Sequence, residues 1–131
     1  MTAILMTIDQ SPGSPTTQGP QLSFKTGQVT VREIVCARVR IEVERHNSDP
    51  KPRPFVGLVN VPLEELTLNR VRERPRELNA ERQIEVALEA VRNGRVIVLF
   101  NGEQVTDMDA PLVLTPVSEA CFLKLVPLVG G

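Results

Sequence analysis

Near the N-terminus, the spacing of apolar and polar residues predicts two strands. Residues 3–8 form an apolar run rich in strand formers, and residues 22–26 alternate apolar with polar side chains before Gly27. The stretch between them, residues 9–20, is dense in proline, glycine, serine and threonine, which predicts a long flexible loop. We therefore expect the two strands to lie side by side as a hairpin.

A helix is predicted to begin at Thr30. Its side chain can accept a hydrogen bond from the backbone N–H of Glu33, whose carboxylate can bond back, as in a capping box. The residues that follow fit two structures, because apolar and polar side chains alternate over residues 35–44 in the period of a strand. The capping signal favours the helix. The single histidine, His46, is predicted to be a solvated residue at the C-terminal end of this helix.

The middle of the chain carries weaker signals. Three prolines within residues 47–54 exclude regular structure, residues 55–61 predict another strand, and residues 62–66 fit one helical turn. Four arginines lie within residues 70–76, which could suggest a basic site. Because glutamates accompany them, this stretch is predicted to be a solvated connector.

The clearest helical pattern covers Ala80–Arg92. Asn79 is a suitable N-cap, and Asn93-Gly94 supplies the left-handed stop that ends many helices. Apolar residues recur at intervals of three and four positions within it, at Ile84, Ala87, Leu88 and Val91. This stripe is predicted to pack on the core.

The C-terminal third predicts a series of strands. Val96–Phe100 is typical of a buried strand, Asn101-Gly102 is a strong hairpin-turn signal, and residues 103–105 begin the return. Residues 120–126 predict a last strand that leads directly into the C-terminal tail. The mixture of elements predicts one α+β domain over residues 1–131, with helices packed on one face of a mixed sheet.

Composition and charge narrow the function. Fifteen basic and sixteen acidic residues give a net charge of −1, so no long-range field favours nucleic acid or an anionic membrane surface. No apolar run approaches the roughly 18 residues that span a bilayer, and no secretory signal is recognisable, which predicts a cytoplasmic protein. Cys36 and Cys121 lack metal-ligand or redox spacing and are predicted to be small buried hydrophobes. With one histidine, neither a metal site nor a histidine-based triad is predicted.

The remaining chemical signal is the pair Gly130 and Gly131 at the end of the sequence. A carboxylate is a poor acyl donor until it attacks the α-phosphate of ATP, which gives a mixed anhydride that sulfur or an amine can displace. Glycine carries no side chain to hinder entry into a narrow active site or approach to the reacting carbon. The sequence therefore predicts that the carboxylate of Gly131 reacts, and that Gly130 leaves space around it because it has no side chain. The protein would be a carrier without catalytic residues or bound cofactor, and ATP would be used by its partner enzyme.

Three segments of the C-terminal third resemble the C-terminal half of β-grasp sulfur carriers of the molybdopterin-synthase small subunit type. They are residues 96–105 with the Asn-Gly-Glu hairpin, residues 107–112 with an acidic stretch and a Pro-Leu step, and residues 122–131 with a Gly-Gly tail. The resemblance implies a ubiquitin-like β-grasp fold in which residues 48–94 are an insertion and residues 127–131 a flexible tail. It also implies that the tail and the strand before it dock on a partner through five residues: Leu123, Leu125, Pro127, Leu128 and Val129.

The orientation of the last strand is open to two interpretations. Strand alternation separates Phe122 and Lys124 from Leu123 and Leu125. The charge of Lys124 argues that the leucines face inward, whereas the resemblance places them outward on the partner-binding face. We favour the outward leucines, because the stem of a lysine can cover apolar surface near a strand end.

Three functions are compatible with the sequence. The first is a ubiquitin-like modifier that an activating enzyme adenylates, passes to a cysteine thioester and joins to target proteins, with a conjugating enzyme and a deconjugating peptidase as further partners. The second is a sulfur carrier with a C-terminal thiocarboxylate for molybdopterin, thiamine or related synthesis, served by a sulfurtransferase. The third is a β-grasp interaction module that is not conjugated. The first is preferred because the insertion offers extra surface for conjugating enzymes.

Overall fold

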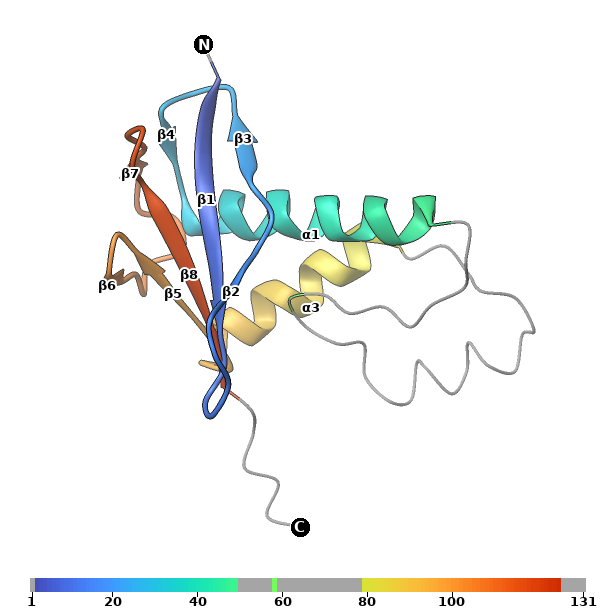
Figure 1. The fold of residues 1–131 in the computed structure, drawn as a ribbon. Helices are drawn as coiled ribbons and strands as arrows, with labels where there is room; N and C mark the ends of the chain where they lie inside the picture. The colour runs from blue at the N-terminus through green and yellow to red at the C-terminus, as the bar shows by residue number, and fades with distance from the viewer. Residues whose placement is uncertain (1, 50–57, 59–78, 126–131) are drawn as a thin grey trace, which may run out of the picture.

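The computed structural model of the protein describes residues 2–49, 58 and 79–125. In Figure 1 the strands of the main sheet lie side by side, and the two helices lie together against one of its faces. The sheet is mixed, since it contains both parallel and antiparallel pairs. The predicted α+β class, with helices on one face of a mixed sheet, is therefore confirmed.

The main sheet consists of six strands: β1 (Ala3–Gln10), β2 (Thr17–Gln18), β3 (Leu22–Phe24), β5 (Val96–Phe100), β6 (Glu103–Gln104) and β8 (Glu119–Lys124). The first strand, β1, and the last, β8, are parallel neighbours at its centre. On the far side of β8, strand β5 is antiparallel to it and is followed by β6. On the far side of β1, both β2 and β3 pair antiparallel with it, which confirms the N-terminal hairpin. A second, two-stranded sheet joins β4 (Gln28–Val29) to β7 (Leu112–Val113).

Helix α1 (Val31–Ser48) begins as the capping box predicts. The Thr30 hydroxyl accepts a hydrogen bond from the Glu33 backbone N–H at 3.2 Å, and the Glu33 carboxylate accepts one from the Thr30 backbone N–H at 3.2 Å. The strand alternative for residues 35–44 is wrong. The alternation there includes Val35, Val39 and Val43, which are four apart, so a helix places them on one buried face.

Helix α3 (Ala80–Arg92) has the predicted bounds, and the Asn79 side chain accepts a hydrogen bond from the Arg82 backbone N–H at 3.3 Å. Its buried face differs slightly from the predicted stripe: the buried residues are Gln83, Ile84, Ala87 and Ala90. Leu88 and Val91 are only partly buried, although they pack against the core. The face is rotated because α3 packs against α1 as well as against β5.

The turn from β5 to β6 confirms the Asn-Gly signal, with φ of 51° at Asn101 and 86° at Gly102. The predicted loop over residues 9–20 is partly wrong, because β1 continues to Gln10 and β2 lies within the stretch. The chain passes so close to β1 at Gly19 that a Cβ there would clash with the Thr7 hydroxyl oxygen. Only glycine fits this crossing.

The strand predicted over residues 55–61 and the turn over 62–66 fall outside the described residues except at Leu58, which is buried in the core. The connector over residues 70–76 lies wholly outside them. Within the described ranges, neither helix combines the length and apolar character that crossing a membrane requires.

Candidate functional site

The last strand, β8, occupies a central place in the sheet and brings the chain to its C-terminal segment. Its hydrogen-bond pairing runs to Leu123 on the β1 side and to Lys124 on the β5 side. One residue further, the Leu125 backbone N–H donates to the Arg95 carbonyl at 2.8 Å. The predicted tail residues Pro127, Leu128, Val129, Gly130 and Gly131 lie outside the described residues, so their roles stay predictions.

The orientation of β8 agrees with the resemblance. Ala120 and Phe122 are fully buried beneath the helices, whereas Leu123 is partly exposed and Leu125 is 36% exposed. Lys124 faces the same side as Phe122, and the argument that its charge would turn this side outward is wrong because Asp9 balances that charge. The leucines therefore face away from the helices, as favoured.

Apolar side chains continue across the face of the sheet opposite the helices. This surface, which we call the open face, comprises Met6, Ile8, Ile97, Leu99, Cys121, Leu123 and Leu125, none of which is buried. The register places Cys121 between Ile8 and Leu99, and Leu123 between Gln10 and Ile97. These residues therefore form one continuous patch that ends where β8 ends.

If the predicted partner enzyme docks on this face, replacing Leu125 with alanine is expected to weaken its binding at least about fivefold, because less apolar surface is then removed from water on binding. The free energy of unfolding should change by less than about 0.5 kcal/mol, as for other exposed positions. Titration calorimetry and urea denaturation measure the two quantities. Phe122→Ala is the matched control on the opposite face, and it should destabilise the fold. A large loss of stability in Leu125→Ala would contradict the outward register.

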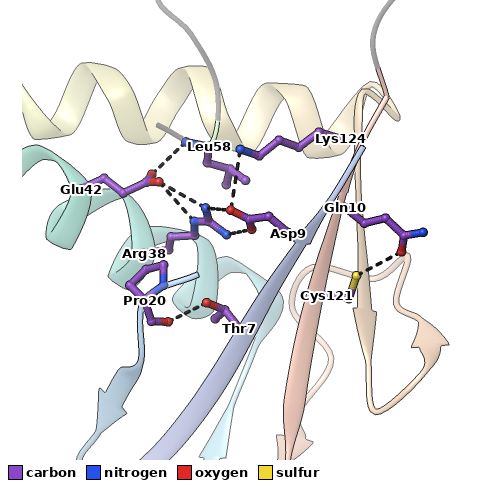
Figure 2. Close-up of polar contacts among 9 residues, drawn as sticks. All are labelled: Thr7, Asp9, Gln10, Pro20, Arg38, Glu42, Leu58, Cys121 and Lys124. Carbon is purple, nitrogen blue, oxygen red and sulfur yellow. Dashed lines mark hydrogen bonds and ion pairs between the residues drawn. The ribbon is translucent and has the colours of Figure 1, made fainter. Parts of the chain in front are cut away.

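Beneath the helices, at the same end of β8, lies a group of charged residues that we call the charge cluster: Asp9, Arg38, Glu42 and Lys124. Figure 2 shows the Arg38 guanidinium at its centre, between carboxylates from β1 and α1. The Arg38 side chain is only 2% exposed. Such a buried charge is tolerated only where it is paired and hydrogen-bonded.

The bonds of Arg38 account for its burial. Both terminal nitrogens donate to the Asp9 carboxylate, Nη2 to Oδ2 at 2.6 Å, and Nε and Nη2 reach Glu42 Oε2 at 3.4 and 3.3 Å. The guanidinium carbon lies 4.7 Å from the centroid of the Phe122 ring, a cation–π distance. Desolvation opposes the charge on Arg38, but the hydrogen bonds that Arg38 donates to Asp9 and the charge of Glu42 outweigh it and raise the pKa of Arg38.

The charge cluster joins distant parts of the chain. Lys124 Nζ of β8 lies 3.8 Å from Asp9 Oδ2 of β1, and the Leu58 backbone N–H donates to Glu42 Oε1 of α1 at 2.9 Å (Figure 2). Leu58 belongs to the predicted insertion and is itself buried, and this contact fastens Leu58 to α1. Sequence reasoning missed the cluster. The available signal was the i, i+4 spacing of Arg38 and Glu42, whereas Asp9 falls in the stretch predicted to be a loop.

Cys36 and Cys121 are only partly buried, so the prediction that both are buried overstated their burial. Burial raises the pKa of the Cys36 thiol, and it raises the pKa of Cys121 together with the charges of Asp9 and Glu119. Both thiols are therefore less nucleophilic near neutral pH than an unperturbed cysteine. His46 lies in the last turn of α1, as predicted, but is only partly exposed.

The site thus combines an apolar open face, a strand that ends at the edge of that face, and a charge cluster beneath it. In the part of the chain that the structure describes, no three His, Cys, Asp or Glu side chains are grouped to hold a metal ion. An exposed apolar face of this kind is typical of a protein interaction surface. A scan against protein-family models and searches of curated proteins and of solved structures found no match to this chain.

Proposed function

We propose that the protein is a ubiquitin-like carrier with a β-grasp fold, whose Gly131 carboxylate is adenylated by a partner enzyme. The order of its elements supports this proposal. An N-terminal hairpin leads into α1, and the chain returns so that β1 and β8 are parallel neighbours at the centre of the sheet. In this arrangement the C-terminal segment follows the central strand of the sheet, and this is the single observation on which the proposal rests most.

The chemistry belongs to the partner and to ATP. The Gly131 carboxylate oxygen attacks the α-phosphate of ATP, pyrophosphate leaves, and an acyl adenylate forms. A cysteine thiol of an enzyme then attacks the acyl carbon, loses its proton and displaces AMP to give a thioester. The absence of side chains at Gly130 and Gly131 leaves this carbon accessible from both faces.

The open face is the proposed docking surface for the activating enzyme. It is apolar and partly exposed, and it runs along β8 to Leu125, from which the chain continues into the tail. An enzyme bound there would contact the chain at Leu125, just before the tail, while the two glycines enter its active site. Apolar patches of this kind commonly mark protein interaction sites.

For the activated glycine we propose conjugation to a protein amine, in which the amine attacks the thioester carbon and releases the thiol. The alternative is attack by a sulfur donor, which leaves Gly131 as a thiocarboxylate. The predicted tail favours the sulfur carrier, because Pro127 stands where ubiquitin carries an arginine and no arginine follows Arg95 in the sequence. A β-grasp module that undergoes neither reaction is the remaining alternative.

Mass spectrometry of the protein from cells that express its natural operon tests these alternatives. Conjugation is expected to give higher-mass adducts. Trypsin cleaves after Lys124, so residues 125–131 should remain attached to the acceptor lysine. A free protein heavier by the difference between a sulfur and an oxygen atom, without adducts, would establish the sulfur carrier instead. The intact mass also reveals whether Gly131 is the last residue, and an unmodified protein that no adenylating enzyme accepts would overturn the whole proposal.

A further inference from the structure

Around Arg38, the negative charges of the cluster outnumber the positive charge of the guanidinium. Its guanidinium carries one positive charge and bonds two carboxylates, those of Asp9 and Glu42. The side chains of both acids are largely buried, with 17% and 12% exposed, so water compensates the second negative charge only weakly. Lys124 supplies the balancing positive charge, with Nζ 3.8 Å from Asp9 Oδ2.

Lys124 is also the last residue of β8. Its backbone is the final position paired with β5, opposite Val96, and the next residue is held by the hydrogen bond from Leu125 N–H to the Arg95 carbonyl. Backbone pairing alone holds strand ends weakly, since terminal hydrogen bonds open without the rest of the fold. A side-chain bond to β1 at this position opposes that opening.

We propose that Lys124 is a positioning residue, whose ion pair with Asp9 fixes the end of β8 and with it the point from which the C-terminal tail continues. The consequence for activation rests on the proposed function. A tail that departs from a fixed point loses less conformational freedom when an enzyme captures it, so the carrier binds more tightly. Once the tail is captured, the enzyme holds the glycines, and the chemical step does not depend on Lys124.

Amide hydrogen exchange of the full chain, measured by NMR, tests whether Lys124 fixes the end of β8. Lys124→Gln should accelerate exchange of the Leu125 amide about two- to fivefold, the range expected for loss of one partly exposed ion pair. The Phe122 amide, deep in the same strand, should change much less. Lys124→Arg keeps the charge and should restore the slow exchange at Leu125. Equal acceleration at both amides, or none at Leu125, would overturn the inference.

A matched control removes a different ion pair of similar length. Glu81→Gln deletes the exposed contact between Arg40 and Glu81, 3.7 Å long, which joins α1 to α3 away from the end of β8. Exchange at Leu125 should be unchanged in this variant. An equal acceleration there would show that any lost charge pair loosens the strand end, and would also overturn the inference.

Pyrophosphate exchange with the cognate adenylating enzyme tests the consequence. Lys124→Gln should raise the KM for the carrier about two- to fivefold and leave kcat unchanged, and Lys124→Arg should restore KM. A lower kcat with unchanged KM would contradict a positioning role. If the wild-type chain supports no exchange, the proposed function fails, whereas hydrogen exchange still decides whether Lys124 fixes the end of β8.

Discussion

Removal of Gly130 and Gly131 is expected to abolish pyrophosphate exchange with the cognate adenylating enzyme. Without them the chain ends at Val129, whose branched side chain lies beside the carboxylate, and the tail is two residues too short to reach the ATP. The Tm should not change, because the core residues of the described part end at Phe122. Radioactive exchange and thermal unfolding measure the two effects.

A variant of unchanged length shows whether the truncated chain fails because its tail is too short or because a side chain crowds the carboxylate. Gly130→Val keeps the carboxylate at Gly131 but adds a branched side chain beside it, and exchange should fall at least about tenfold, or about 1.4 kcal/mol in the barrier. Wild-type exchange by the truncated chain would rule out Gly131 as the reacting residue. A truncated chain with a lower Tm would show that the tail stabilises the fold.

Arg38→Ala is expected to lower the free energy of unfolding by about 3–5 kcal/mol, the range for removing one partner of a buried ion pair. The carboxylates of Asp9 and Glu42 would lose their shared partner, and the Phe122 ring would lose the guanidinium that covers it. Urea denaturation measures the change, provided that the slope with denaturant stays constant.

Two further variants test whether the loss comes from the buried charges. Arg40→Ala, on the exposed side of the same helix, should change stability by less than about 0.5 kcal/mol. Combining Arg38→Met with Asp9→Asn, Glu42→Gln and Lys124→Met removes all four charges of the cluster and should recover part of the loss, because no buried charge is left without a partner. A loss below about 1 kcal/mol in Arg38→Ala would contradict the importance of the cluster.

The elements with strong local signals could be predicted from the sequence. Thr30 and Asn79 mark the two helix starts, and each cap makes the expected hydrogen bond. Asn101-Gly102 defines its turn, because these residue types accept the positive φ that a tight hairpin needs. The outward direction of Leu123 and Leu125 also followed from the resemblance.

What escaped prediction depends on contacts between distant residues. Arg38, Arg40 and Glu44 look alike in the local pattern, and burial of Arg38 requires Asp9, which is 29 positions away in the sequence. Strand β2 has two residues, too few to show a period, and forms because it pairs with Ile8 and Asp9. The buried face of α3 depends on its packing against α1.

The parallel pairing of β1 with β8 has a consequence for how the chain folds. Met6 of the first strand lies beside Glu119 of the last, roughly 110 residues later, so the centre of the sheet forms only by closing a very long loop. Such non-local pairing slows folding, and a growing chain on the ribosome cannot complete its sheet until β8 has emerged. We expect chains that terminate before β8 to lack this central strand, to leave apolar surface exposed and to be cleaved by proteases. A folded molecule therefore always contains the strand that leads to the tail.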